Sequence, residues 1–151
     1  SVSELNGQGP RFKNKIYSLQ RRTSLGRMAG EALESYELKG YSIDYNEEKI
    51  MLEMLHRAVK NKEWIVITGW QPHSMFKIYD LKYLQDPRKV FGEEDHCATL
   101  VRRGLQQGNG ELYEIVRDFR LEMPVVNEAL RQITVEGISL EEAAVKYLDS
   151  I

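Results

Sequence analysis

The chain has 151 residues, 42% hydrophobic and 29% charged, which is the composition of one ordinary globular domain. Its net charge of -2 at pH 7 gives no global field that favours nucleic acid, so we expect no nucleic-acid partner. The single cysteine, Cys97, excludes an internal disulfide and a multi-cysteine metal site. No apolar run approaches the roughly 18 residues needed to span a bilayer, and the polar opening at residues 1–5 is not a signal peptide. Because the first residue is not methionine, we expect the chain to be part of something longer.

The first half of the chain alternates short strand patterns with helical ones. Strands are predicted at residues 15–19 and 41–45, with a helix at 25–38 between them that ends before Gly40. Asn46 is the expected N-cap of a second helix, which runs to about Asn61. A β-branched apolar run at 64–68, closed by Gly69, is typical of an inner strand. This order predicts an α/β fold with a mostly parallel sheet.

The second half is predicted to be mainly helical. Residues 75–90 are mixed and aromatic up to the stop at Asp86-Pro87, and residues 98–101 are expected to form a short strand. A glycine- and glutamine-rich loop at 104–110 precedes three helices, at 111–119, 124–134 and 140–148. Ser139, with Glu142 three residues later, predicts a capping box at the start of the last helix.

The residues that follow Gly69 carry the clearest functional pattern: Trp70, Gln71, Pro72 and His73. Pro72 suits the first position of a following helix, and ligands in open α/β sheets bind beyond the carboxyl ends of the strands. An indole face attracts a cation, while an imidazole and free helix N–H groups attract an anion. Together they describe a small zwitterion with a quaternary ammonium and a carboxylate. The alternative is structural: Trp70 caps the end of the sheet and His73 is hydrogen-bonded in the first helical turn.

Enzymatic patterns are weak in this sequence. There is no glycine-rich phosphate loop, nucleophile elbow or His-x-x-x-His motif, and the histidines His56, His73 and His96 are far apart. A small α/β enzyme that uses His96 and Cys97 is the weakest option, because adjacent residues on a strand point to opposite faces. We therefore expect no catalysis, no cofactor and no metal.

Several segments of the chain resemble the glycine betaine-binding proteins of ABC importers. The resemblance is carried by residues 69–76, 79–84, 86–87, 90–93, 101–105 and 142–144, and upstream by 13–16 and 36–38. It implies that residues 1–151 form a single α/β lobe, the carboxyl-terminal lobe of a type II periplasmic-binding-protein fold with a helical tail. It also implies an extracytoplasmic protein, either periplasmic or lipid-anchored at the outer face of the cytoplasmic membrane.

The resemblance also implies partners and site residues. The partners are an ABC permease, a missing amino-terminal lobe and a zwitterionic or quaternary-ammonium osmolyte such as glycine betaine, proline betaine or choline. A homodimer of the fragment is also expected, because a second copy would cover the half of the ligand site that the missing lobe leaves open. In this family an aromatic cage holds the trimethylammonium group; here Trp70 matches a cage tryptophan and His73 a candidate partner of the ligand carboxylate. The ligand-binding residues that the resemblance implies are Trp70, His73, Gln71, Pro72, Thr23 and Ser24.

Two features of the chain depart from the family pattern. Ser74 stands where members usually carry a second aromatic, and the loop Gln20-Arg21-Arg22-Thr23-Ser24 replaces an acidic, glycine-rich one. Two arginines repel a trimethylammonium group, which leaves two alternatives open. Either the ligand is more anionic, or the chain is an interaction or sensory module that keeps the lobe fold without betaine binding, with the arginines facing an acidic partner.

Overall fold

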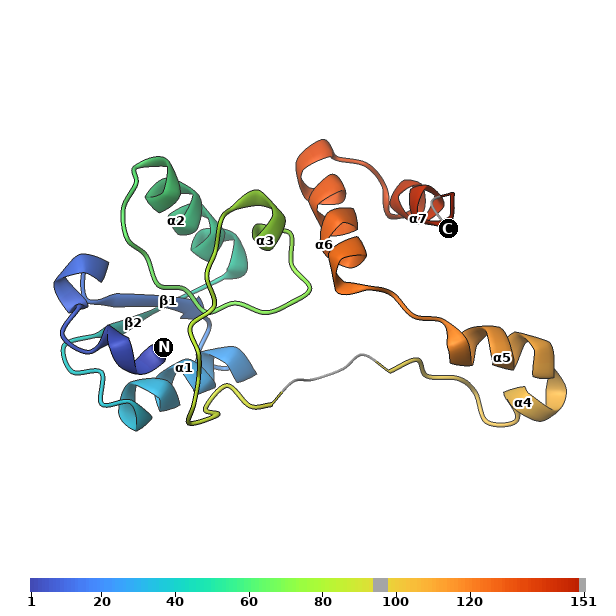
Figure 1. Ribbon diagram of the computed structural model, residues 1–151, viewed down its shortest axis with the longest axis horizontal. Helices are drawn as coiled ribbons and strands as arrows, with labels where there is room; N and C mark the ends of the chain where they lie inside the picture. The colour runs from blue at the N-terminus through green and yellow to red at the C-terminus, as the bar shows by residue number, and fades with distance from the viewer. Residues whose placement is uncertain (94–97, 150–151) are drawn as a thin grey trace. The chain divides into compact units, whose positions relative to one another are not determined.

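The computed structural model describes residues 1–93 and 98–149 of the chain (Figure 1). The chain consists of two compact units, Ser1–Glu93 and Glu94–Ile151. The first is an α/β unit and the second is helical, as the two halves of the sequence predict.

The α/β unit is built on a small parallel sheet. Strand β1 (Lys15–Leu19) pairs in parallel with β2 (Ser42–Asn46), with Ile16 opposite Ile43. On the other side of β1, the Tyr17 N–H donates to the Val66 carbonyl and the Thr68 N–H donates to the Tyr17 carbonyl, both at 2.9 Å. The predicted strands at 15–19 and 41–45 and the parallel sheet are therefore confirmed, the second strand being shifted by one residue.

The prediction of an inner strand at 64–68 is wrong. Among the described residues, this segment contributes only an isolated parallel bridge between Ile67 and Tyr17. Trp64 is 61% exposed and lies beside Phe12, with the ring centroids 5.6 Å apart. The inner strand is β1, because β2 pairs with one side of it and residues 66–68 with the other.

Helices α1 (Ser24–Ser35) and α2 (Glu48–Lys60) lie on opposite faces of this sheet (Figure 1). Helix α1 ends three residues earlier than predicted, since Glu37 adopts a left-handed conformation with φ of 50°. The N-cap of α2 is Glu47 and not Asn46, whose side-chain amide instead donates to the backbone carbonyl and the carboxylate of Asp44. Met51 and Leu55 of α2 are fully buried, as their 3,4 spacing predicts.

The core of this unit lies between α1, the sheet and the amino-terminal segment. Two short 3₁₀ turns, η1 (Val2–Leu5) and η2 (Gly9–Phe12), precede β1. The Tyr41 hydroxyl donates to the Leu5 carbonyl at 3.1 Å and so ties the first turn to the segment before β2. The buried members of the core are Val2, Leu5, Ile16, Ala32, Tyr36, Leu38 and Tyr41.

The helical unit contains α4 (Leu105–Gly108), α5 (Gly110–Asp118), α6 (Met123–Arg131), the π-helical turn η3 (Gln132–Glu136) and α7 (Leu140–Leu148). The three predicted helices are confirmed, and the last one has the predicted bounds. Residues 98–101 form no strand, because they pair with nothing among the described residues, and Leu100 is 92% exposed. One helical turn, α4, lies inside the predicted loop.

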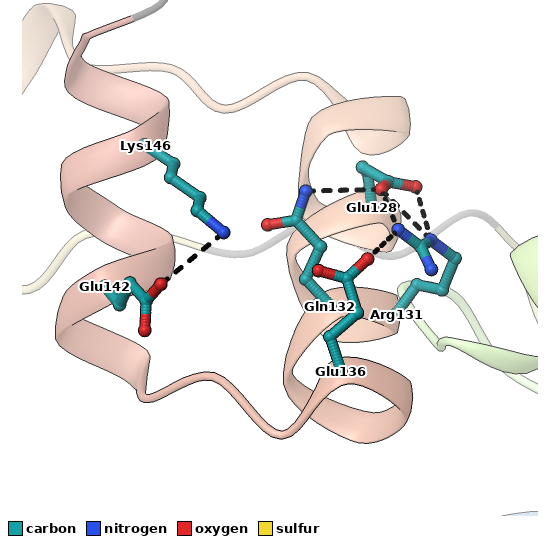
Figure 2. A network of polar contacts seen from close by, with 6 residues as sticks. All are labelled: Glu128, Arg131, Gln132, Glu136, Glu142 and Lys146. Carbon is teal, nitrogen blue, oxygen red and sulfur yellow. Dashed lines mark hydrogen bonds and ion pairs between the residues drawn. The ribbon is translucent and has the colours of Figure 1, made fainter.

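Polar contacts join the end of α6 to η3 and connect successive turns of α7 (Figure 2). Arg131 binds Glu128 at 2.7 Å and Glu136 at 2.6 Å. The capping box predicted at α7 forms only in part. The Ser139 hydroxyl accepts the Glu142 N–H at 3.0 Å, but the Glu142 carboxylate lies 3.6 Å from Lys146 one turn later.

Candidate functional site at the carboxyl edge of the sheet

Three corners follow the carboxyl ends of the parallel segments. Residues 20–24 follow β1, residues 47–48 follow β2, and residues 69–74 follow the segment that bridges to β1. The segments run in parallel, so their ends lie at one edge of the sheet, where open α/β folds place their ligands. Within residues 1–93 and 98–149, none of the helices has the length and apolar character of a transmembrane segment, and no three metal-ligating side chains are grouped as they would be around an ion.

A buried hydroxyl pair fixes the backbone just before the Trp70 corner. The Thr68 hydroxyl donates to the Ser18 hydroxyl at 3.0 Å, and the two residues are 5% and 0% exposed. The next residue is Gly69, and the side chain of Met75, which is 1% exposed, packs against it. A Cβ at Gly69 would lie 2.6 Å from the Met75 methyl carbon. The glycine that ends the predicted strand therefore allows the chain to turn over a buried methionine.

Trp70 and His73 are in direct contact at this corner. Their ring centroids are 4.7 Å apart and their planes are nearly perpendicular, at 89°. The indole of Trp70 is half-buried, and His73 is only 7% exposed. The two residues that the sequence singled out thus form one aromatic unit at the edge of the sheet.

Both ring nitrogens of His73 have partners within the protein. The Met75 N–H donates to Nδ1 at 3.0 Å, and Nε2 lies 3.2 Å from a carboxylate oxygen of Glu48. Because Nδ1 accepts a hydrogen bond, the neutral imidazole carries its proton on Nε2, which then donates to Glu48. The hydrogen bonding expected in the structural alternative is therefore present at His73.

The residues between Trp70 and the next helix correct one prediction. Gln71 is exposed and forms a cis peptide bond with Pro72. Pro72 does not begin a helix, since α3 (Met75–Ile78) is a single turn that starts three residues later. The N–H of Met75, the first residue of α3, donates to the His73 imidazole. Ser74, which is 6% exposed, is the N-cap of α3.

Thr23 and Ser24 lie at the neighbouring corner, where α1 begins. The Thr23 hydroxyl donates to the Gln20 carbonyl at 2.8 Å and accepts the Gly26 N–H at 3.0 Å, so it caps α1. Ser24 is exposed, and its hydroxyl accepts a long hydrogen bond of 3.5 Å from Arg27. The structure therefore brings Trp70 and His73 into contact, and places Thr23 and Ser24 at the end of the adjacent strand.

Glu48 is a site residue that the sequence pattern did not indicate. Its position at the start of α2 is sufficiently explained by the helix dipole, and yet its carboxylate contacts His73. The preceding residue, Glu47, accepts a hydrogen bond of 3.5 Å from Gln20 in the loop after β1. The signal that could have indicated Glu48 is its position, because Glu47 and Glu48 directly follow a parallel strand. His96 and Cys97, the pair of the enzymatic option, lie outside the described residues.

Comparison with known proteins decides the family. Residues 1–150 match the family described as the substrate-binding domain of the ABC-type glycine betaine transport system. The chain belongs to this family. A curated member, the glycine betaine/carnitine transport binding protein GbuC of Listeria monocytogenes, is 33% identical over 119 residues. That match covers 78% of this chain and 39% of the Listeria protein.

Solved structures of this betaine-binding family share the fold. Lactococcal OpuAC, in a closed conformation complexed with glycine betaine, is 31% identical, with a TM-score of 0.78 over 99% of this chain and 58% of that one. The glycine/betaine/L-proline-binding protein ProX of Borrelia burgdorferi is 30% identical, with a TM-score of 0.74 over 99% of this chain and 57% of that one. The type II binding-protein fold expected from the sequence is confirmed. The chain spans roughly two fifths to three fifths of the length of these relatives.

Proposed function

We propose that residues 1–151 are one lobe of an extracytoplasmic solute-binding component of an ABC importer, which recognises glycine betaine or a related quaternary-ammonium osmolyte. The observation that carries the proposal is the half-buried Trp70 at the carboxyl edge of the sheet, in a chain that belongs to the betaine-binding family. An indole face attracts a quaternary ammonium by about 0.5–1 kcal/mol when exposed and by about 2 kcal/mol once the site is desolvated.

Each site residue has a role in this proposal. Trp70 is one wall of the aromatic cage, and the adjacent Gln71 and Pro72 shape its rim. His73, with Thr23 and Ser24 at the next corner, lines the polar side of the site. A second lobe supplies the remaining walls, or a second copy of the chain covers the half-site. In this role the protein makes and breaks no covalent bonds; it binds the ligand and delivers it to the permease.

The test is a titration of glycine betaine into the full-length gene product that contains this chain, followed by tryptophan fluorescence. We expect a saturable change whose dissociation constant rises at least tenfold in Trp70→Ala, because about 1.4 kcal/mol corresponds to a factor of ten. Trp64→Ala is the matched control. Trp64 is the other tryptophan of the chain and precedes the bridging segment, so it lies at the opposite edge of the sheet.

A flat response to glycine betaine, choline and carnitine in the unsubstituted protein would reject the proposal. Equal losses in Trp70→Ala and Trp64→Ala would also count against it, because they would reflect a general effect on folding.

A second candidate is an interaction or sensory module that keeps the fold without the cage. It is favoured by the bonding of two polar site residues, because the Thr23 hydroxyl caps α1 and both ring nitrogens of His73 contact protein groups. Arg21 and Arg22, both exposed beside this corner, would then face an acidic partner. The same titration separates the two candidates, since this module gives no betaine response.

A further inference from the structure

The contact between α2 and the Trp70 corner assigns a role to a residue outside the expected ligand set. Glu48 is the first residue of α2, and its side chain is 53% exposed. Its carboxylate oxygen lies 3.2 Å from Nε2 of His73, a side chain that is 9% exposed. A half-exposed carboxylate at the positive end of a helix therefore reaches a buried imidazole.

The Glu48 carboxylate accepts a hydrogen bond from one tautomer of His73. Nδ1 accepts the Met75 N–H at 3.0 Å, so the proton of the neutral ring is on Nε2 and is directed at Glu48. A hydrogen bond made by one ring nitrogen sets the proton position and orientation of the ring, as at metal-bound histidines. With both nitrogens engaged, the imidazole is fixed in its plane.

The fixed imidazole in turn fixes the indole. His73 and Trp70 meet nearly at right angles, at 89°, with their centroids 4.7 Å apart. A perpendicular arrangement of two aromatic rings is favoured because the positive edge of one ring meets the negative face of the other. Rotation of the imidazole would therefore change the tilt of the Trp70 plane.

We propose that Glu48 is a positioning residue of the ligand site: by accepting the Nε2–H of His73, it holds the imidazole and, through it, the Trp70 indole in the orientation that meets the ligand. The ligand-binding part of this inference rests on the proposed function. The effect on His73 and Trp70 does not, and it can be measured without any ligand.

The first measurement is made on the 151-residue chain labelled with ¹⁵N. In the unsubstituted protein, long-range ¹H–¹⁵N spectra are expected to show His73 as the Nε2–H tautomer. Glu48→Gln keeps an acceptor oxygen and is expected to preserve both this signature and the Trp70 indole resonance. Glu48→Ala is expected to keep the Nε2–H tautomer, which the Met75 N–H selects, but to move the Nε2 resonance and, because the imidazole is no longer held, the Trp70 indole resonance. Glu53→Ala, on an exposed position of the same helix, is the matched control and is expected to change neither.

The second measurement is the betaine titration of the full-length protein. Loss of a charge-assisted hydrogen bond is expected to weaken binding about tenfold in Glu48→Ala, and Glu48→Gln is expected to restore most of it. Glu48→Ala should add no further loss to His73→Ala, because a residue that acts through another shows no independent effect.

The two measurements separate the inference from the proposed function. An unchanged Trp70 indole resonance in Glu48→Ala would overturn the inference, as would fully additive losses with His73→Ala. If the unsubstituted protein shows no response to betaine but Glu48→Ala still alters both resonances, the proposed ligand is wrong while the control of the Trp70 corner by Glu48 stands.

Discussion

The buried hydroxyl pair of Ser18 and Thr68 joins β1 to the segment that ends at the Trp70 corner. The donor and acceptor oxygens are 3.0 Å apart, at residues that are 0% and 5% exposed. We expect Ser18→Ala to lower the free energy of unfolding by about 1–3 kcal/mol, because it leaves the Thr68 hydroxyl buried without its acceptor. Urea unfolding followed by circular dichroism measures this change.

Replacing both partners is the control. Thr68→Val removes the stranded hydroxyl with little change of shape, so the double variant Ser18→Ala/Thr68→Val is expected to recover part of the loss. A double variant less stable than Ser18→Ala alone would show that packing, and not the unmet hydroxyl, governs this position.

Asp86 organises the turn that follows the aromatic segment. Its carboxylate accepts a hydrogen bond from the Tyr36 hydroxyl and another from the Phe91 N–H, the latter at 2.7 Å. Burial acts to raise the pKa of Asp86, but the hydrogen bonds from Tyr36 and from the backbone of Phe91, Val90 and Arg88 outweigh it and keep the pKa below its usual value. The folded state therefore binds a proton at Asp86 less readily than the unfolded state.

This lowered pKa predicts the direction of the acid response. A depressed pKa contributes stability that is present above the unfolded value, near pH 4, and is lost as the pH falls through the folded value. Asp86→Asn is expected to flatten the decline of stability between about pH 5 and pH 2, as measured by urea unfolding across that range. A residual slope is expected from Asp44, whose pKa is lowered by its hydrogen bond from Lys15. An unchanged slope in Asp86→Asn would contradict the assignment.

At the scale of single residues, the sequence identified Trp70 and His73 but not Glu48. An indole and an imidazole three residues apart after a glycine are visible along the chain, and their contact is local. The Glu48–His73 contact joins residues 25 positions apart and depends on how α2 is rotated about its own axis. No local pattern determines that rotation, so an acidic residue at a helix start is explained by the dipole alone.

Helix α1 shows how one glycine sets the distance between an element and the site. A Cβ at Gly26 would clash with the Gln20 carbonyl oxygen and lie 2.7 Å from the Leu19 carbonyl oxygen, both of them backbone atoms. We expect Gly26→Ala to destabilise the protein by about 1–3 kcal/mol, because the first turn of α1 must move away from the end of β1. The same displacement would carry Thr23 and Ser24 away from the edge of the sheet, and urea unfolding measures its cost.

Gly30, one turn later in the same helix, is the matched control. A Cβ there would lie 3.3 Å from the Tyr45 hydroxyl, the end of a side chain that can adjust. Alanine also gains about 1 kcal/mol over glycine in a helix interior, so Gly30→Ala is expected to be close to neutral. Similar losses at both positions would show that the cost comes from α1 itself and not from its contact with the carboxyl end of β1.

At the scale of elements, the predictions hold where the signal is local. Alternation predicts β1, and the Ser139 cap with its following apolar spacing predicts α7. The predictions fail where the outcome depends on distant partners. Residues 64–68 are apolar enough for an inner strand, yet only three of them run alongside β1. Pro72 is compatible both with a helix start and with a turn, and the buried Met75 places the helix three residues later.

At the scale of the whole molecule, the distribution of buried residues differs between the two units. The core cluster of Val2, Leu5 and their neighbours belongs entirely to Ser1–Glu93. The helices of the second unit expose large apolar side chains, including Ile115, Leu140 and Leu148 at 62%, 69% and 60%. Helical spacing alone predicts these helices, but it cannot tell which face becomes buried, because that depends on what packs against them.

The candidate site has a binding strength that can be bounded from its parts. One indole contributes about 0.5–1 kcal/mol to a cation when exposed and about 2 kcal/mol when desolvated, whereas micromolar affinity requires about 8 kcal/mol. In the proposed cage Trp70 is one wall, and the chain spans only 58% of a relative that was solved closed around glycine betaine. We therefore expect the 151-residue chain alone to bind glycine betaine with a dissociation constant of about 1 mM or weaker, as measured by calorimetry. The full-length protein, titrated in parallel, is expected to bind far more tightly because closure desolvates the indole and adds walls. Submillimolar binding by the 151-residue chain would mean that this edge of the sheet forms a complete site by itself or through a second copy, and a concentration-dependent change in mass would distinguish these two cases.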